Sequence, residues 1–179
     1  MERLSGRLAS RNANKLRELR HALPDWELEL LEADGYPPEE GETYYDNALA
    51  KARFGRKHTS DWVLGEDSGI EVSALGGRPG VDSARWADDG IAALLKALQG
   101  TENRRARYVC ELVALSPEGE ELRGTGTLAG TIGREPRGGE GFGYDPIFIP
   151  EGESRTVAEL GNDWKGQHSH RARAARALN

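Results

Sequence analysis

Apolar residues in the first third of the chain alternate between the two-residue period of strands and the three-to-four-residue period of helices. Residues 4–8 alternate weakly, as in a strand, and after a polar loop the leucines of 16–23 recur at helical spacing until Pro24. Residues 26–30 alternate again, and an acidic loop leads to an alanine-rich segment that predicts a helix over about 43–56. The chain therefore begins with two strand-loop-helix units.

The rest of the chain predicts further strands and helices. Residues 62–64 form a short apolar strand that runs into Glu66–Gly69, and 70–75 continue extended. Beyond them the pattern predicts a helix over 91–98, a hairpin of 106–115 with 121–130, a glycine-rich loop, a short strand at 147–149 and a terminal helix. No internal repeat or linker interrupts the pattern, so we expect one α/β domain over residues 1–179.

Composition is typical of a globular protein from a reducing compartment. Hydrophobic residues make up 37% and charged residues 30% of the chain, and 23 glycines indicate many tight turns. The single cysteine, Cys110, excludes a disulfide within the chain. No apolar stretch approaches the roughly 18 residues that span a bilayer, and the N-terminus lacks the apolar core of a signal peptide. We therefore expect a cytoplasmic protein with no membrane partner.

The distribution of charge indicates a small anionic ligand. A net charge of −6 argues against a stable nucleic-acid partner, since domains that bind nucleic-acid backbones are normally basic. Basic residues nevertheless gather in 11–20 and in 165–176, while carboxylates crowd the segment 34–46. A small polyanion bound together with a metal ion suits both signs of charge.

The polar segment Ser10–Lys15 is the first candidate site. It lies between a predicted strand and a predicted helix, and it offers backbone amides, a hydroxyl, an amide side chain and a lysine, all of which bind phosphate. A plain helix cap made by Ser10 or Asn12 explains the same residues. The segment alone does not decide between the two interpretations.

Two adjacent acids, Glu66 and Asp67, are the second candidate. Because side chains alternate along an extended backbone, the two carboxylates should point in different directions, so that one holds a metal ion while the other acts on a water. A solvent-facing turn is the alternative, since acids and glycine are common in turns. The apolar residues on either side disfavour that turn, because a partly buried carboxylate needs a partner.

A cluster of acids over 39–42 precedes the helix predicted from about residue 43. Such a cluster complements the helix dipole or is simply solvated, and a metal site would need a partner elsewhere. Asn47 and Lys51 follow at a spacing of four, so they share a helix face and present an amide and a cation to the same ligand.

Two segments in the last third complete the candidates. Gly141–Pro146 sets aromatic residues among glycines, which suits stacking on a base or packing of Phe142 and Tyr144 onto the core. The segment 165–171 is basic, and its alternative interpretation is a helix start capped by Ser169. The two histidines in this region are too isolated to argue for zinc. No P-loop, dinucleotide fingerprint, nucleophile elbow or His-Glu-x-x-His motif is present.

Taken in order, these segments resemble the inosine triphosphate pyrophosphatase (ITPase) family, also called the XTP/dITP pyrophosphatases, over nearly the whole chain. The resemblance rests on Ser10–Lys15, Asp46–Ala52, Glu66–Gly69, Gly77–Arg85, Gly141–Phe148 and Ser169–Arg171. It implies a mixed, elongated α/β sheet with flanking helices and a central cleft (the ITPase-like, or Maf/Ham1-like, fold), usually as a homodimer. The implied reaction is Mg²⁺-dependent hydrolysis of inosine, deoxyinosine or xanthosine triphosphate to the monophosphate and pyrophosphate.

The resemblance also implies roles for individual residues. Asp67 is the expected general base and also faces the metal, and Glu66 with Glu39 is expected to hold Mg²⁺ directly or through water, although Glu40 is an equal candidate for the second position. The family usually has two aspartates where this chain has Glu66 and Asp67. Ser10, Asn12, Lys15 and Lys51 are expected to grip the triphosphate, Ser68 to line the cleft, and Phe142, Tyr144, Asp145, Lys165, His170 and Arg171 to surround the base.

Two alternative functions fit the same segments less well. A Maf-like pyrophosphatase has a related architecture and prefers other nucleotides, but residues 142–145 and 169–171 favour the ITPase family. A non-catalytic nucleotide-binding protein would retain the ligand at the substituted acid pair without turnover.

Overall fold

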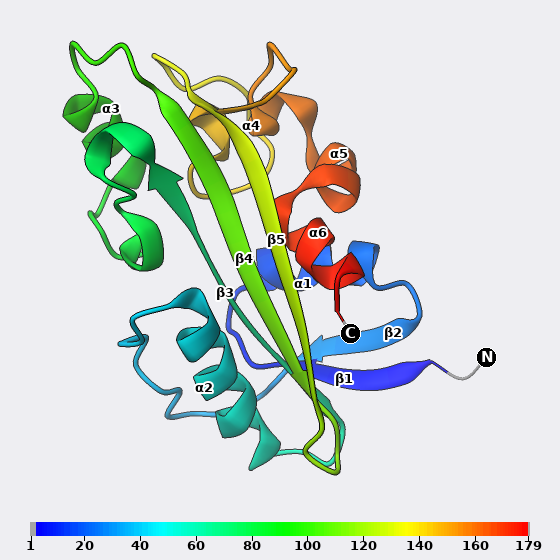
Figure 1. Ribbon diagram of the computed structural model, residues 1–179. Helices are drawn as coiled ribbons and strands as arrows, with labels where there is room; N and C mark the ends of the chain where they lie inside the picture. Colours follow the sequence, from blue (N-terminus) through cyan, green and yellow to red (C-terminus); the bar gives the residue numbers. More distant parts are fainter. Residues whose placement is uncertain (1–2, 179) are drawn as a thin grey trace.

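The computed structural model describes residues 3–178, which form one six-stranded mixed sheet with helices on both faces (Figure 1). The strands are β1 (Leu4–Leu8), β2 (Trp26–Leu30), β3 (Trp62–Val72), β4 (Arg105–Leu115), β5 (Glu121–Ile132) and β6 (Phe148–Pro150), in the spatial order β2-β1-β3-β4-β5-β6. Strand β1 is parallel to β2 and β3, and all other pairs are antiparallel. The expected mixed, elongated α/β sheet is therefore confirmed.

Within residues 3–178, six α-helices flank this sheet. They are α1 (Ala13–Ala22), α2 (Tyr44–Arg56), α3 (Gly90–Ala97), α4 (Val157–Leu160), α5 (Asn162–His168) and α6 (His170–Arg176). The alanines of α2 pack with Val113 and Leu115 of β4, whereas the alanines of α6 pack with Cys110 and Leu112 of the same strand. Because neighbouring strand residues face opposite sides, α2 and α6 cover opposite faces of the sheet.

Glycines in the central strands allow the helix backbones to approach closely. A Cβ atom at Gly65 of β3 would lie 1.9 Å from the carbonyl oxygen of Ala48 in α2. On the other face, a Cβ atom at Gly126 of β5 would lie 2.0 Å from the carbonyl oxygen of His170 in α6. Any larger residue at Gly65 would push α2 away from the sheet, and any larger residue at Gly126 would push α6 away from it.

Most of the predicted elements are present, with three corrections. The acid pair does not lie between two separate strand segments, because β3 runs unbroken from Trp62 to Val72. The predicted extended segment ends earlier than expected, since a 3₁₀ turn occupies Ser73–Leu75. The expected helix start capped by Ser169 is confirmed, since its hydroxyl accepts from the amide of Ala172. Two short helices, α4 and α5, precede it and were not predicted; they meet at Gly161, whose positive φ of 92° ends the first of them.

Within residues 3–178 the structure contains no helix of the length and apolar character needed to span a membrane.

Candidate active site

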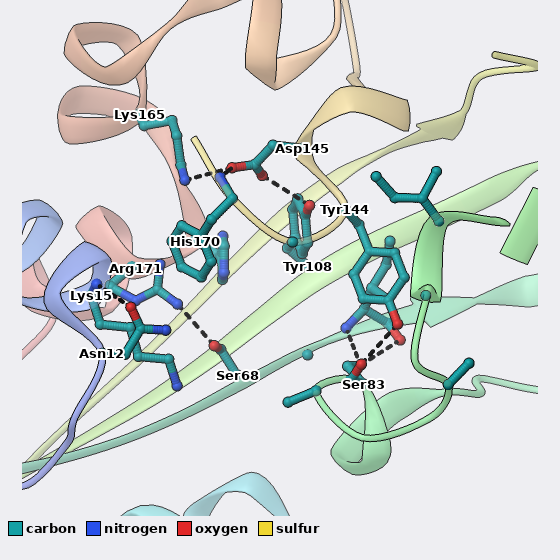
Figure 2. A pocket seen from close by; sticks show the side chains of 18 of the residues that line it. Asn12, Lys15, Ser68, Ser83, Tyr108, Tyr144, Asp145, Lys165, His170 and Arg171 are labelled. Carbon is teal, nitrogen blue, oxygen red and sulfur yellow. Dashed lines mark hydrogen bonds and ion pairs between the residues drawn. The ribbon is translucent and has the colours of Figure 1, made fainter. Parts of the chain in front are cut away.

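A cavity of about 590 Å³ opens beside the central strands and gathers most of the residues that the sequence singled out (Figure 2). Its walls include Asn12, Lys15, Ser68, Phe142, Tyr144, Asp145, Lys165, His170 and Arg171. These residues come from the α1 start, β3, the glycine-rich loop and the last two helices, so the fold joins both ends of the chain here. Ser10, Glu39, Lys51, Glu66 and Asp67 lie outside the cavity wall.

Glu66 and Asp67 point to opposite faces of β3, as the alternation of the strand predicted. Glu66 contacts Lys15 of α1 and Arg171 of α6, whereas Asp67 contacts Asn47 and Lys51 of α2. Lys15 and Arg171 both line the cavity. The two acids therefore serve different surroundings although they are neighbours in sequence.

Asp67 is a buried carboxylate with few partners. Asn47 Nδ2 donates to Asp67 Oδ2 at 2.8 Å, and Lys51 Nζ lies 3.9 Å from Oδ1. Burial raises the pKa of Asp67 to about 6, while Lys51 and the Asn47 hydrogen bond act in the opposite direction. A carboxylate with this pKa is ionised near neutral pH and basic enough to take a proton from water, which suits a general base.

Glu39 approaches the same lysine from the loop before α2. It forms an ion pair with Lys51, and Arg85 NH1 lies 3.3 Å from its other carboxylate oxygen. Burial alone would raise the pKa of Glu39, but the ion pair and hydrogen bond with Lys51, together with the charges of Lys15 and Arg85, hold it below its usual value. Glu40 is exposed. Of the two candidates, Glu39 is thus the one directed at the Asp67 side of the sheet.

The carboxylates supply the oxygen donors that Mg²⁺ prefers, but they do not form a ready-made cage. Among residues 3–178 no three His, Cys, Asp or Glu side chains converge as a metal site. Glu39 and Asp67 instead share the ammonium group of Lys51, which marks the place where their negative charge requires a cation. This donor set fits a metal ion whose remaining ligands are phosphate oxygens and water.

Glu66 is held from two sides by cations. Lys15 Nζ lies 2.8 Å from Oε2, and Arg171 lies 3.2 Å from Oε1, which also accepts from the thiol of Cys110 at 3.3 Å. Although burial alone would raise the pKa of Glu66, Arg171 and Lys15 hold it well below its usual value. Glu66 therefore remains ionised and fixes both cations at the cavity.

Asp145 organises the other end of the cavity (Figure 2). Its Oδ2 accepts from Lys165 Nζ at 2.6 Å and from the backbone amide of Phe142 at 2.9 Å. Its Oδ1 accepts from the hydroxyl of Tyr108 at 2.9 Å. The carboxylate therefore joins β4, the glycine-rich loop and α5 in a single hydrogen-bonded group.

Two buried residues of this site were not identified from the sequence. Glu18 of α1 accepts ion pairs from Lys165 and Arg171. Its position beside the leucines of an amphipathic helix gave no signal, because its partners lie far along the chain. Tyr108 occupies an inward position of β4, where the sequence indicates only a core aromatic.

The aromatic residues of the site divide between the core and the cavity wall. Tyr144 is buried and donates from its hydroxyl to the carbonyl of Ser83 at 2.8 Å, so this residue follows the core-packing interpretation. Phe142 is only partly buried, and Lys165 Nζ lies 4.5 Å from its ring centroid. His170 stacks on Tyr108 with centroids 4.5 Å apart. Burial, and then the charge of Arg171, lower the pKa of His170 well below its usual value.

The loop before α1 caps its helix in this structure. Ser10 Oγ accepts from the amide of Asn12 at 3.0 Å, and Asn12 Oδ1 accepts from the amides of Asn14 and Lys15. Across the cavity, Ser68 accepts from Arg171 NH2 at 2.9 Å. The cap directs the N-terminal turn of α1 and the side chain of Lys15 toward the cavity, which is the arrangement that favours anions.

Comparisons with known proteins agree with the fold and identify related chains. The model of the Ham1 family matches residues 7–179. A curated dITP/XTP pyrophosphatase of Bdellovibrio bacteriovorus is 46% identical over 79% of this chain and 75% of its own length. The Ham1 protein of Staphylococcus aureus superposes with a TM-score of 0.84 at 36% identity, covering 96% of this chain and 94% of that one. A nucleoside-triphosphatase, dITP/XTP pyrophosphatase, of Mycobacterium abscessus superposes with a TM-score of 0.75 at 43% identity, covering 97% of both chains.

Proposed function

The chain belongs to the Ham1 family, and from this premise we propose that it hydrolyses the nonstandard purine nucleotides ITP, dITP and XTP to the monophosphate and pyrophosphate. The enzyme is a hydrolase of nucleoside triphosphates that removes these nucleotides from the nucleotide pool. Its relatives named dITP/XTP pyrophosphatase align over nearly the whole chain, as in the 44% identical protein of Nocardia farcinica, which covers 96% of this chain.

One structural observation carries this proposal. A continuous chain of contacts leads from Asp145 through Lys165, Glu18 and Arg171 to Glu66, whose sequence neighbour is Asp67. The first members of this chain line the cavity in which we propose that the base binds, and its last member is the sequence neighbour of the proposed catalytic carboxylate. A base held by one end is thus connected through rigid, buried ion pairs to the end where the phosphates react.

Asp67 is the proposed general base. Its ionised carboxylate takes a proton from a water, the water oxygen bonds to a phosphorus of the α–β bridge, and the bridge breaks to leave monophosphate and pyrophosphate. Burial places the pKa of Asp67 at about 6, so the carboxylate is available at neutral pH. Proton transfer of this kind contributes roughly 10²- to 10⁴-fold to a rate.

The proposed phosphate-binding residues come from both sides of β3: Lys51 contacts Asp67, whereas Lys15 contacts Glu66. We assign Lys15 and Lys51 as the cations, Ser10 and Asn12 as the start of α1, and Ser68 as the hydroxyl at the cavity wall. In the structure both lysines are neutralised by carboxylates, Lys15 by Glu66 and Lys51 by Glu39. Such pairs keep the lysines extended toward the site, and an incoming triphosphate competes for their charge.

Mg²⁺ is the proposed cofactor. Glu39 and Asp67 are its proposed ligands, because they already share a cation. Glu66, which the resemblance also assigns to the metal, points to the opposite face of β3 and is paired with Lys15 and Arg171, so we do not include it in the proposed set. When bound, the ion neutralises phosphate charge and polarises the phosphoryl group. The protein residues keep their own tasks: Asp67 accepts the proton from water, and Lys15 and Lys51 bind the phosphates.

Base selection follows from the donors at the Asp145 end. Lys165 and Arg171 present cationic N–H groups to the cavity, and Phe142 offers a partly exposed ring. Donors that meet a 6-oxo group oppose the 6-amino group of adenine, and such a polar mismatch discriminates by roughly 10⁴-fold or more. Guanine shares the 6-oxo group, so it must be rejected at its 2-amino group.

Two properties of the whole protein remain part of this proposal. We propose that it acts in the cytoplasm, where its nucleotide substrates occur, and that it forms a homodimer as the family resemblance implies. Sedimentation of the purified chain tests the second statement: a monomer at micromolar concentration would refute it.

The identity of the products tests the proposed reaction. Incubation with ITP and Mg²⁺ should yield equal amounts of monophosphate and pyrophosphate, resolved by ion-exchange chromatography. Diphosphate and inorganic phosphate would show that a different bond is cleaved. A preference for nucleotides other than ITP and XTP would favour the Maf-like alternative, and tight ITP binding without products would identify a non-catalytic binder.

A further inference from the structure

The side chain of Asn47 lies buried between Asp67 and the loop that carries Glu39. Only 2% of its surface is exposed. Its Nδ2 donates to Asp67 Oδ2 at 2.8 Å, and its Oδ1 accepts from the backbone amide of Gly41 at 2.8 Å. One amide group therefore joins the proposed base on β3 to the loop that precedes α2.

The position of Asn47 on α2 is itself fixed. Thr43 and Asp46 form a capping box at the start of the helix, and Asn47 donates its backbone amide to the carbonyl of Thr43. One turn further along the same face, Lys51 contacts both Glu39 and Asp67. Asn47 thus projects from a rigid helix, and its amide has one orientation that satisfies both partners.

Gly41 shows how closely the loop is fitted to this amide. A Cβ atom at Gly41 would lie 2.6 Å from Asn47 Oδ1 and 2.7 Å from the Cβ atom of Asp46. Both distances are shorter than real Cβ contacts, so any side chain at this position displaces the loop or the amide. The absence of a side chain is therefore required by the contact with Asn47.

Asp67 has few other restraints on its carboxylate. Lys51 is the only cation paired with it in the described part of the chain, at 3.9 Å, and Lys51 is shared with Glu39. A triphosphate that draws Lys51 away would leave the Asn47 hydrogen bond as the restraint that orients the carboxylate. A base misplaced by about 1 Å loses roughly 100-fold in rate, so this restraint has a direct catalytic consequence.

We propose that Asn47 is a positioning residue. Its amide holds Asp67 in the orientation that accepts the proton from water, and it fixes the loop that carries Glu39 relative to Asp67. This inference rests on the proposed function and assigns a residue to the same site. Asn47 acts through Asp67, because its side chain is buried and its amide bonds to Asp67 and to the Gly41 backbone.

Three variants separate the two halves of this contact. Asn47→Asp retains an acceptor for the amide of Gly41 but replaces the donor to Asp67 with a second carboxylate that repels it, whereas Asn47→Ala loses both contacts. Gly41→Ala leaves Asn47 unchanged and displaces it from the loop side. Asn103→Asp is the matched amide-to-acid control, because Asn103 is exposed and uses only its oxygen, which accepts from the amide of Arg105.

Steady-state kinetics with ITP and Mg²⁺ is the deciding measurement, and thermal melts verify that each variant is folded. We expect kcat to fall roughly 10- to 100-fold in all three site variants, with KM within about twofold of the wild type, and the control to match the wild type. Unchanged kcat in folded variants, or a raised KM with unchanged kcat, would overturn the positioning role. A wild-type chain that releases no pyrophosphate would refute the proposed function itself, and the inference with it.

Discussion

The hydroxyl of Tyr108 donates a 2.9 Å hydrogen bond to Asp145 Oδ1, on the opposite oxygen from the one that Lys165 occupies. Both oxygens of Asp145 are therefore engaged without any ligand. This arrangement fixes the carboxylate, and with it the ammonium group of Lys165, before a base arrives. The base-recognition end of the site is preorganised by protein groups alone.

Removal of the Tyr108 hydroxyl should loosen this end of the site. In Tyr108→Phe the buried Asp145 Oδ1 loses its donor, and a hydrogen bond to a charged group contributes about 1.5–3 kcal/mol. We expect a loss of that order in the free energy of unfolding, measured with urea, together with a raised KM for ITP. Wild-type stability and KM in this variant would show that Asp145 needs no such support.

Replacing Glu18 should strongly reduce the free energy of unfolding. Its carboxylate lies between Lys165 and Arg171, both buried, and the pKa of Glu18 is lowered because these cations outweigh burial. Glu18→Gln leaves two buried cations short of an anion, which costs about 3–5 kcal/mol. Chemical denaturation measures this, with the exposed Glu27→Gln as control, expected within about 0.5 kcal/mol of the wild type. Equal stabilities of the two variants would contradict the assignment.

His170 should make the protein less stable in mild acid. Burial and the charge of Arg171 lower the pKa of His170 well below the ordinary value of 6.5. Below pH 6.5 the imidazole is therefore protonated in the unfolded chain while it is still neutral in the folded chain. Stability is then fully present above pH 6.5 and falls as the pH decreases, by up to about 1.4 kcal/mol per pH unit. Urea unfolding between about pH 5 and pH 7 should show a shallower decrease in His170→Gln. Identical slopes in both proteins would refute this origin.

The orientation of side chains along the central strands could be predicted from the sequence. The two-residue period of β3 is enough to predict that Glu66 and Asp67 face opposite ways. The spacing of four residues likewise predicts that Asn47 and Lys51 share a helix face, and in the structure both contact Asp67. Local signals of this kind need only a strand or a helix. The Pro-Glu-Gly segment 117–119 between two apolar segments likewise predicted the hairpin of β4 and β5.

The unpredicted features depend on contacts between distant parts of the chain. Glu18 and Arg171 are 153 residues apart, and nothing near either residue shows that they meet. The short helices α4 and α5 lack the length for a periodic pattern, since α4 spans only 4 residues. The sequence also did not show whether Tyr144 or Phe142 enters the core, because packing decides that choice.

Loss of the Asp67 carboxylate should abolish turnover and spare binding. Asp67→Asn keeps the size of the side chain but removes the proton acceptor, so kcat should fall by at least about 10³-fold. Isothermal titration with a non-hydrolysable ITP analogue should give a Kd within a few-fold of the wild type. Near-normal turnover by this variant would remove Asp67 from the role of base.

The most direct test of the whole account is pyrophosphate release by the purified chain from ITP, XTP, GTP and ATP, each with Mg²⁺ and with chelator. We predict selective release from ITP and XTP that requires Mg²⁺, with kcat/KM for ATP lower by roughly 10⁴-fold. Equal rates with ATP, undiminished release in chelator, or no release from a folded chain would contradict it.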